Sequence, residues 1–491
     1  MKKIRETITG MVLEDYQAGD VPQLERVTSV YDKITRKYIP TAGFVLDNEF
    51  ATYRFKEQLL RTFTAGTPYA NFEIEHIPME LGQPTMPFKS TIRLLKSQKQ
   101  VSDKMMASGN QVFLNIPTAT GKTVISVDFI SKLQVKTIVI CHKKKILSQW
   151  YDTFRTKTDI DIGRVMIINS SQYFYDVISG DLDPNDTDIW LATPSVISSF
   201  CGDHGWDMLE DLFGFMGIGL KIIDEAHRCF GTTIKINSHT SIRTLYLSAD
   251  FNQANGYIRK MYFDSLRDAV VIRYDQETMN DLKHITCVQY EFDTHPSDED
   301  LVAVTNYTRK NRYHWDHFEY TKYTMRNGTV LKHVENIINE IIKSEENVKS
   351  DDDGKPYKIL VLTNMIDNVD EIYNKLSRKV TSRTVARYHT KIPKEETTTY
   401  LNADIIVSTY QAFGEGVDVV TPCIRHVIST SPVDAIMANQ SAGRCRPIKD
   451  LESYYWMMVD MGFEFCRNNE VRVTRYLANA KIGKVTRIEA G

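Results

Sequence analysis

Two short segments carry the residue types that bind and hydrolyse a nucleoside triphosphate. Residues 120–123 read Thr-Gly-Lys-Thr. In such a segment the lysine reaches the β- and γ-phosphates, and the threonine hydroxyl holds Mg²⁺. Far along the chain, Asp224 and Glu225 form an acidic pair. One such carboxylate can hold Mg²⁺, directly or through water, and the other can orient or deprotonate the attacking water.

The first segment departs from the general phosphate-loop pattern G-x-x-x-x-G-K-[ST], because Ile116 stands at the first glycine position. Its surroundings fit the pattern. Residues 111–116 predict a strand, and residues 126–133 have the apolar spacing of a helix. The segment therefore lies where a strand runs into a helix N-terminus, at which backbone N–H groups and the helix dipole favour a phosphate. A chance Gly-Lys-Thr in a turn is the alternative.

The acidic pair also follows a predicted strand. Residues 220–224 are mostly apolar and deliver Asp224 and Glu225 to the carboxyl end of that strand. Parallel α/β sheets present groups to their ligands at that end. An acidic pair there is by itself commonly only the start of a helix. It follows Lys122 by 102 residues (224 minus 122), with further strands between, which favours a shared nucleotide site.

Two regions repeat short apolar runs, each followed by a polar or helical stretch. Short apolar runs without alternation are typical of strands buried on both faces of a parallel sheet. The repetition of strand and helix predicts two open α/β domains. The runs of the first region are 111–116, 137–141, 164–169, 188–193, 220–224 and 244–249, and those of the second are 358–363, 384–389, 403–409, 425–430 and 454–460.

Other segments break this rhythm. Residues 30–55 predict a β-hairpin followed by more strand or helix, and residues 77–88 carry the glycines and prolines of a linker. Residues 250–357 are long and polar. A chain of 491 residues is too long for one core. We place the domains at 1–88, 89–290 and 291–491, the last with the polar stretch as linker or insert.

The composition is that of a soluble globular protein, with 42% hydrophobic and 25% charged residues. The 60 basic and 63 acidic residues nearly balance, which neither demands nor excludes a nucleic-acid partner, because binding depends on a local basic stripe. Seven scattered cysteines without a C-x-x-C pair favour reduced thiols. No signal peptide or membrane span is apparent, so we expect a cytoplasmic protein without a membrane partner.

In order along the chain, these segments resemble the motifs of the superfamily 2 helicases and translocases. Residues 117–123 match the family's P-T-G-x-G-K-T loop except at Ala119, and residues 224–227, Asp-Glu-Ala-His, match its motif II. Gln98 resembles the glutamine that reads adenine. The other matches in this region are 142–150 (motif Ia), 191–200 with Thr193 (a nucleic-acid-contacting segment), and 247–250 (motif III, with Asp250 in place of threonine).

The second α/β region continues the resemblance. Residues 439–447 fit motif VI, Q-x-x-G-R-x-x-R, up to Arg444. The second arginine position holds Pro447, and Arg446 comes one residue early. We therefore expect Arg444 and Arg446 to share the role of arginine finger. The other matched positions are Gln440 and Gly443 in motif VI, 358–376 in motif IV, and Thr409, Gly416 and Asp418 in motif V, within 405–418.

The resemblance implies two tandem RecA-like domains with parallel sheets, a small N-terminal α+β accessory domain, and an enzyme that hydrolyses ATP with Mg²⁺. The residues implied in catalysis are Lys122, Asp224, Glu225, His227, Gln440, Arg444 and Arg446. Those implied in ATP binding are Gln98, Pro117, Thr118, Ala119, Thr120, Gly121, Lys122, Thr123, Gly416 and Asp418, with Thr123 and Asp224 at the metal.

Nucleic-acid contacts are expected in both regions. Lys143 and Lys144 follow a predicted strand, which favours phosphate contact over a solvated face, and the resemblance adds Thr193 and Thr409. Residues 306–326 interleave aromatic and basic side chains that could stack on bases and pair with phosphates. For most of them we favour an amphipathic helix with its aromatic residues packed inward. Two contact candidates are kept there, Arg309 and Arg312.

Within the superfamily, Gln149-Trp150 after motif Ia and the Q-x-x-G-R of motif VI look most like the UvsW-type bacteriophage helicases. This resemblance implies ATP-dependent remodelling of branched or forked DNA without sequence preference. The implied reactions are fork reversal, Holliday-junction branch migration and R-loop unwinding in phage replication, recombination and repair. It also implies a monomer in the host-cell cytoplasm, with single-strand-binding or recombination proteins as partners.

Other functions stay open at this point. A duplex DNA translocase without strand separation, or an RNA helicase, would use the same motifs. A nucleotide kinase predicts one α/β domain and a lid, which leaves Gly443 and Arg444 in a second domain unexplained. An ATP-gated scaffold is disfavoured by the intact Lys122, Asp224 and Glu225. ATPase activity that depends on nucleic acid would separate a motor from the kinase and the scaffold.

Overall fold

The structure is a computed structural model, and it divides into two compact units, Met1–Tyr274 and Asp275–Gly491. The sequence pattern predicts this division between residues 290 and 291. Strand β15 (Ile285–Phe292), which spans that boundary, belongs to the sheet of the second unit. The residues that the structure describes are 2–13, 29–32, 37–40, 43–46, 49–53, 72–117, 120–228, 230–248, 269–308, 312–350, 354–392, 399–414, 423–478 and 481–490.

The first unit is built on a seven-stranded sheet with the order β10-β11-β9-β12-β13-β8-β14, in which all neighbours are parallel. Every run predicted in this region is a strand, and β14 is an additional edge strand. The bounds are β8 Gln111–Asn115, β9 Thr137–Cys141, β10 Val165–Ile167, β11 Ile189–Ala192, β12 Leu220–Asp224, β13 Arg243–Ser248 and β14 Val270–Ile272.

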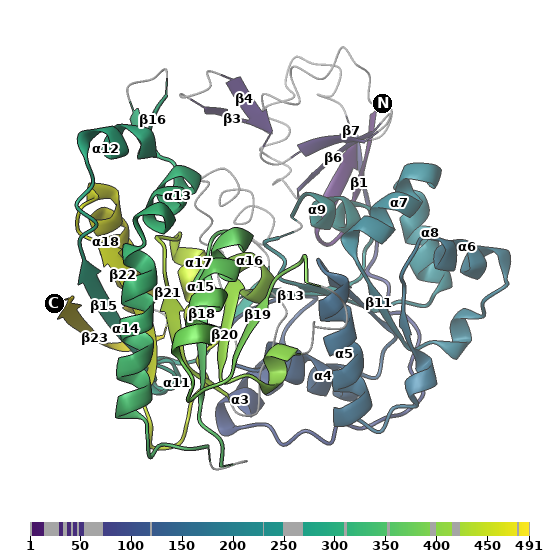
Figure 1. Ribbon diagram of the computed structural model, residues 1–491. Helices are drawn as coiled ribbons and strands as arrows, with labels where there is room; N and C mark the ends of the chain where they lie inside the picture. The colour runs from purple at the N-terminus through teal and green to yellow at the C-terminus, as the bar shows by residue number, and fades with distance from the viewer. Residues whose placement is uncertain are drawn as a thin grey trace. The chain divides into compact units, whose positions relative to one another are not determined.

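Helices cover both faces of this sheet (Figure 1). One face packs against α6 (Gln172–Ser179), α7 (Pro194–His204), α8 (Met208–Phe215) and α9 (Phe230–His239), whose buried aromatic residues include Phe174, Phe200 and Phe213. On the other face α5 (Lys144–Lys157) contacts β9, β10 and β11, and α4 (Lys122–Leu133) contacts α5 and α3 (Lys96–Ala107). The sheet is therefore buried on both faces, as its uninterrupted apolar runs predict.

The second unit repeats the architecture, with a seven-stranded sheet of order β19-β20-β18-β21-β22-β15-β23 and parallel neighbours throughout. Its predicted runs are also confirmed as strands. The bounds are β18 Lys358–Thr363, β19 Val385–Tyr388, β20 Ile405–Thr409, β21 Ile424–Ser429, β22 Ser453–Asp460 and β23 Ile482–Glu489. The expected fold class, α/β with two tandem parallel-sheet units, is correct.

Two helix layers enclose the second sheet (Figure 1). Apolar residues of α14 (Thr329–Ser344) and α15 (Ile366–Lys379) form one core with the strands. Residues of α17 (Ala435–Ala442) and α18 (Glu464–Ala478) form the other. Helix α13 (His317–Asn327) buries Tyr320 and Tyr323 against Phe463, which confirms the inward packing expected for these aromatic residues.

In its described residues, the N-terminal segment of the first unit contains antiparallel hairpins and a mixed sheet. Strands β3 (Ser29–Asp32) and β4 (Lys37–Pro40) form the hairpin predicted in 30–55, and β5 (Gly43–Leu46) pairs with β6 (Glu49–Tyr53). Strands β1 (Lys2–Glu6), β2 (Gly10–Leu13) and β7 (Phe72–His76) complete the sheet β5-β6-β2-β1-β7.

This N-terminal sheet is anchored to the sheet of the first unit through α9. The hydroxyls of Thr7 and Thr9 both donate to the carbonyl of Asn237, at 2.9 and 2.8 Å. Gly10 lies against α9 so closely that a Cβ atom there would be 2.8 Å from the Cα of Ser238. The hairpin β1–β2 therefore packs as a fixed layer on the helix that follows the acidic pair.

Residues 77–88, which the sequence predicts as a linker, are instead packed along the first sheet. The backbone N–H of Gln83 donates to Gly217, and the N–H of Lys136 donates back to Gln83, at 2.8 and 2.9 Å. Gly82 has a φ of +69°, and a Cβ atom there would lie 2.3 Å from Gly219. Close backbone approach, and not flexibility, explains why glycine occurs at this position.

Within the described ranges, no helix has the length and apolar character needed to cross a membrane. The described cysteines form no disulfide with one another.

Candidate active site

The described residues of the predicted phosphate-binding segment lie between the carboxyl end of β8 and the start of α4. Gly121 caps α4 with a φ of +93°, a left-handed conformation that favours glycine. A Cβ atom at this position would lie 2.6 Å from the Nε2 atom of Gln98. No acidic residue occupies the first turn of α4, so its free N–H groups and dipole favour an anion. Thr118 and Ala119 lie outside the described residues.

Lys122 and Thr123 begin α4. The Lys122 ammonium donates to the carbonyl oxygens of Ile116 and Pro117, at 3.3 and 3.4 Å. The Thr120 hydroxyl donates to the same Pro117 carbonyl at 2.7 Å. The ammonium therefore lies over the loop, at the end of the helix where a phosphate would bind.

Gln98 is held beside the same loop. Its Nε2 atom donates to the carbonyl of Thr120 at 3.1 Å, and its Oε1 atom accepts the N–H of Leu95 at 3.0 Å. The Tyr274 hydroxyl donates to the same Thr120 carbonyl at 3.1 Å. Two separate elements, α3 and the segment after β14, thus fix the loop at Thr120. The structure places Gln98 at the loop, and its reading of adenine stays a prediction.

Asp224 is the last residue of β12, and its side chain is buried. Its Oδ2 atom accepts the indole N–H of Trp150 at 3.0 Å, and its Oδ1 atom accepts the backbone N–H of Glu225 at 2.9 Å. Burial, and after it the negative charge of Glu225, raise the pKa of Asp224 to about 6. The Trp150 hydrogen bond and the positive charge of Lys122 oppose this rise.

Glu225 and His227 follow on a tight turn. Glu225 has a φ of +48°, which is uncommon for a residue with a side chain and turns the chain sharply after the strand. Its Oε2 atom lies 3.3 Å from the Nδ1 atom of His227. The same Nδ1 atom lies 2.8 Å from the Oγ atom of Ser248, at the end of β13. The Asp-Glu-Ala-His segment is thus connected to the motif III segment by a buried polar contact.

Strand order explains how these distant residues meet. Strand β13 lies between β12 and β8, so the carboxyl ends of the three strands bring Asp224, Ser248 and the loop after Asn115 to one edge of the sheet. Strand β9 lies on the other side of β12, next to β11. The topology therefore brings the predicted nucleotide residues of the first unit together at the edge where α/β sheets bind ligands.

The donor set at this edge fits Mg²⁺. The buried carboxylate of Asp224 and the hydroxyl of Thr123 are oxygen donors, which Mg²⁺ prefers. Within the part of the chain that the structure describes, no group of three or more histidine, cysteine or acidic side chains could hold a metal by itself. Mg²⁺ usually keeps several water molecules and binds through one or two carboxylates plus phosphates. The two protein ligands Asp224 and Thr123 are therefore sufficient for such a site.

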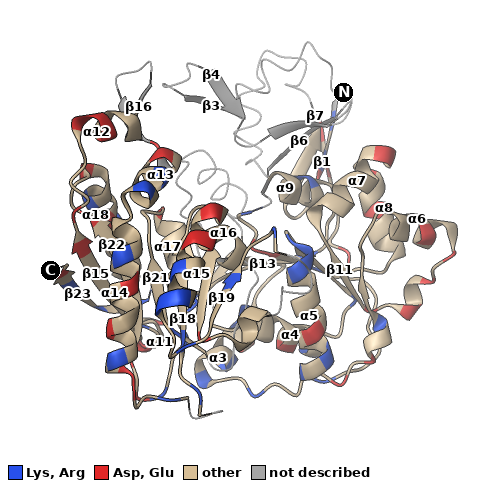
Figure 2. Cartoon of the chain, in the orientation of Figure 1, with Lys and Arg blue, Asp and Glu red and all other residues tan. Residues whose placement is uncertain are grey.

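The predicted nucleic-acid contacts of the first unit follow two neighbouring strands, β9 and β11, at the same edge of the sheet. Lys143 caps α5 and Lys144 begins it, directly after β9, and Figure 2 shows basic residues at the start of this helix. The Lys144 ammonium donates to the Asn169 carbonyl at 3.2 Å. Thr193 follows β11 and caps α7, but its hydroxyl is buried and lies 2.9 Å from the Ser195 hydroxyl.

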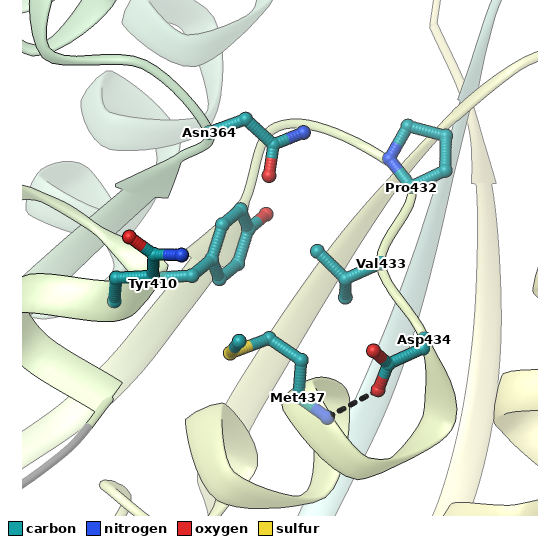
Figure 3. Close-up of a pocket in the computed structure, with 7 residues that line it drawn as sticks. Asn364, Tyr410, Pro432, Val433, Asp434 and Met437 are labelled. Carbon is teal, nitrogen blue, oxygen red and sulfur yellow. Dashed lines mark hydrogen bonds between the residues drawn. The ribbon is translucent and has the colours of Figure 1, made fainter. Parts of the chain in front are cut away.

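In the second unit, a pocket lies at the carboxyl ends of β18, β20 and β21 (Figure 3). Its volume is about 190 Å³. The Tyr410 ring forms one wall, and its hydroxyl lies 2.7 Å from the Ser429 hydroxyl. Asp434 caps α17 by accepting the N–H of Met437 at 2.8 Å. The described lining residues are Asn364, Tyr410, Gln411, Pro432, Val433, Asp434 and Met437.

Of the motif V and VI candidates that the structure describes, Thr409 lies next to a lining residue of this pocket and the others lie on α17 or directly after it. Thr409 precedes Tyr410, and its hydroxyl accepts the N–H of Ala412 at 3.1 Å. Gln440 lies on α17, and the backbone N–H groups of Arg444 and Arg446 donate to Ser441 and Ile424 at 3.0 and 3.3 Å. Three candidates, Gly416, Asp418 and Arg309, lie outside the described residues, and Arg312 is described only as backbone of β17 (Arg312–Trp315).

Three contacts at the predicted nucleotide site could not be predicted from the sequence. They are those of Trp150 with Asp224, Tyr274 with Thr120, and Ser248 with His227. Trp150 entered only as part of a family resemblance, and Ser248 only as part of motif III. Nothing in the local sequence around Trp150 or Tyr274 indicates a partner 74 or 154 residues away. Only the strand order makes these contacts possible.

Part of the first unit is similar to a known protein family. Residues 91–253 match the family model described as Type III restriction enzyme, res subunit. Curated proteins give no match to the chain. Among similar solved structures, the DEAD-box helicase Mss116 bound to ssRNA and UDP-BeF has a TM-score of 0.52 at 14% identity, over 81% of this chain and 75% of that one.

Two further structures have lower scores. The Hef helicase domain of Pyrococcus furiosus has a TM-score of 0.46 at 13% identity, over 77% of this chain and 97% of that one. Dbp5 of S. cerevisiae bound to RNA and ADP BeF3 has a TM-score of 0.49 at 11% identity, over 82% and 90%. The similarity to Mss116 agrees with the two parallel-sheet units in showing a tandem RecA-like fold, and residues 91–253 are similar to the res subunit of Type III restriction enzymes.

Proposed function

We propose that this protein is an ATP-driven helicase or translocase that remodels branched DNA. The observation that carries the proposal is the edge of the first sheet. There, the helix-capping loop with Lys122 follows β8, and the buried Asp224 with its neighbour Glu225 ends β12, on the other side of β13. This is the residue set for phosphoryl transfer to water, and a second RecA-like unit with Arg444 and Arg446 is what a motor requires beyond a simple hydrolase.

The proposed reaction assigns a role to each residue of this chain. Lys122 and the first N–H groups of α4 bind the β- and γ-phosphates of ATP. Glu225 orients a water molecule and accepts its proton as the oxygen attacks the γ-phosphorus, and ADP leaves. Asp224 and Thr123 hold Mg²⁺, which supplies charge neutralisation on the phosphates when bound. Arg444 and Arg446 stabilise the negative charge that develops on the transferred group.

In this proposal, ATP hydrolysis is coupled to nucleic-acid binding through residues that follow the carboxyl ends of other strands in both sheets. Lys143 and Lys144 in the first unit, and Thr409 in the second, contact the sugar–phosphate backbone, whereas the buried Thr193 holds the start of α7. Such contacts carry no sequence information, so the motor acts on branched or forked DNA of any sequence. The pocket beside Thr409 has both polar and apolar walls and is a further place for a nucleotide of the bound strand.

DNA is favoured over RNA by the similarity to a restriction-enzyme subunit. An RNA helicase is the second candidate, favoured by the similarity to a helicase whose structure contains ssRNA. A duplex translocase that does not separate strands uses the same residues.

The test compares ATP hydrolysis and strand rearrangement on a Holliday junction, a fork, an R-loop, a plain duplex with single-stranded tails, and single-stranded RNA. We expect the largest stimulation of hydrolysis and ATP-dependent product formation with the branched DNAs. The matched control is Glu225→Gln, which keeps the side-chain volume and removes the base. Hydrolysis that is indifferent to every nucleic acid contradicts the motor, and stimulation by RNA alone assigns the second candidate.

A further inference from the structure

Trp150 is the least expected neighbour of the predicted nucleotide site at the carboxyl ends of β8, β12 and β13. It lies on α5, one turn and a half after the basic residues at the helix start, and its side chain is fully buried. Its indole N–H donates to the Oδ2 atom of Asp224 at 3.0 Å. The Cys141 sulfur, at the end of the neighbouring strand β9, lies 4.0 Å from the same oxygen.

The two oxygens of the Asp224 carboxylate are held by different parts of the fold. Oδ1 accepts the backbone N–H of Glu225, and Oδ2 accepts the Trp150 indole. A carboxylate held at only one oxygen can rotate about its terminal bond, which is a broad torsion in aspartate. A second donor from another element fixes this rotation and therefore the direction of the remaining lone pairs.

Packing alone does not account for the contact. The apolar face of α5 also buries Ile146, Leu147 and Phe154, and a phenylalanine at 150 would continue that face. The indole adds an N–H donor, which must find an acceptor when it is buried. A carboxylate acceptor makes this a charge-assisted hydrogen bond, stronger than one between neutral groups.

We propose that Trp150 is a positioning residue for ATP hydrolysis: it fixes the rotation of the Asp224 carboxylate so that its free lone pairs point to the site of Mg²⁺. The inference rests on the proposed function, because it assumes that Asp224 holds the metal of a bound nucleotide. Residues that orient a metal ligand in this way commonly contribute tenfold to hundredfold to metal affinity.

Trp190 offers a matched control within the same unit. It lies on β11 and is as fully buried as Trp150. Among the described residues, its indole N–H has no hydrogen-bond partner. Trp150→Phe and Trp190→Phe therefore remove similar amounts of buried ring, but only the first removes a hydrogen bond to Asp224.

The experiment measures Mn²⁺ affinity in the presence of ADP by electron paramagnetic resonance, together with the Mg²⁺ concentration at half-maximal ATPase rate. We expect Trp150→Phe to weaken Mn²⁺ binding at least tenfold and to raise the half-saturating Mg²⁺ concentration in parallel. The affinity for ADP in the presence of a chelator should stay unchanged. Trp190→Phe should leave all three quantities as in the unsubstituted protein.

A second variant covers the case in which Trp150→Phe does not fold. Site-specific replacement of Trp150 by its benzothienyl analogue keeps the size and shape of the bicyclic ring and removes only the N–H group. Equal Mn²⁺ affinities for this variant and the unsubstituted protein overturn the positioning role, while the proposed function stands. If the unsubstituted protein itself binds no Mn²⁺ with ADP and hydrolyses no ATP, the proposed function fails and the positioning role fails with it.

Discussion

His227 and Ser248 lie 2.8 Å apart, measured from the imidazole Nδ1 atom to the hydroxyl oxygen, although 21 residues separate them in the chain. They meet because β12 and β13 are parallel neighbours, and the N–H of Ala226 donates to the carbonyl of Leu247 at 3.1 Å. Since His227 also contacts Glu225, Ser248 is one contact removed from the proposed catalytic base.

Replacing Ser248 with alanine should lower the maximal ATPase rate roughly fivefold, because one hydrogen bond that orients His227 is lost, at about 1 kcal/mol. The effect should appear in kcat and not in the affinity for ATP. Steady-state kinetics with saturating nucleic acid measure both. Ser241→Ala is the control, since the buried Ser241 hydroxyl bonds to the carbonyl of Ile77, away from the acidic pair. An equal loss in both variants would show that the effect is only structural.

Lys122→Ala and Glu225→Gln should separate nucleotide binding from hydrolysis. Loss of the Lys122 ammonium should weaken ATP binding tenfold or more, because a charge that faces the phosphates is removed. Glu225→Gln should bind ATP normally and hydrolyse it about 10² to 10⁴ times more slowly, the usual contribution of a general base. Fluorescent-nucleotide binding and phosphate release measure the two steps. Lys132→Ala, at the other end of α4, is the control, and turnover by Glu225→Gln at the normal rate would remove Glu225 from catalysis.

Separate alanine substitutions should identify the arginine finger. If Arg446 is the finger, Arg446→Ala should lower kcat by more than two orders of magnitude while ATP affinity changes little. A loss of tenfold or less would leave that role to Arg444, and Arg444→Ala should then show the large effect. The exposed Arg472 on α18 provides the control substitution.

Lys221 should make the stability of the first unit depend on pH. Its ammonium is fully buried and donates to the Thr240 hydroxyl and the Asn237 side chain, at 2.6 and 3.1 Å. Burial lowers the pKa of Lys221 to about 7, from an ordinary value of 10.5. Between these values the unfolded chain retains the proton that the folded chain releases, so the free energy of unfolding rises with pH.

The expected gain from this lysine is about 2 to 3 kcal/mol between pH 7 and pH 9, at roughly 1.4 kcal/mol per pH unit. Urea unfolding of the protein and of Lys221→Met at several pH values measures it. The difference in the free energy of unfolding between the protein and Lys221→Met should change with pH by this amount. Lys99→Met, at an exposed position, should show the same pH dependence as the unsubstituted protein. A constant difference between the protein and Lys221→Met across this pH range would contradict the lowered pKa.

Gly10→Ala should loosen the N-terminal sheet from α9. The added methyl group would lie 2.8 Å from backbone and side-chain atoms of Ser238, and overpacking of this kind typically costs about 1 to 3 kcal/mol. Limited proteolysis should then cut within residues 1–90 faster than in the unsubstituted protein. Gly109→Ala is the matched control, because nothing lies within 4 Å of a Cβ atom there. Equal cleavage rates in the two variants would contradict the anchoring.

Most strands of both sheets could be read from the sequence, because a strand buried on both faces needs an uninterrupted apolar run and few other elements do. Strands β14, β15 and β23 were not found in this way. In β15, polar residues interrupt the apolar ones, among them Thr286 and Gln289. Both are buried, and Glu452 and Thr474 accept their hydrogen bonds at 3.1 and 3.0 Å. A local pattern does not reveal that such partners exist. The same holds for residues 77–88, whose close packing depends on Gly219 far along the chain.

The sequence by itself determined which residues could carry the chemistry, because the spacing of Gly121, Lys122, Asp224 and Glu225 relative to predicted strands is a local property. Only the tertiary structure decided which groups orient them. Trp150 reaches Asp224, and Ser248 reaches His227, because β12 lies between β9 and β13 in the sheet. Strand order is set by the packing of the whole unit, which no short segment of the sequence encodes.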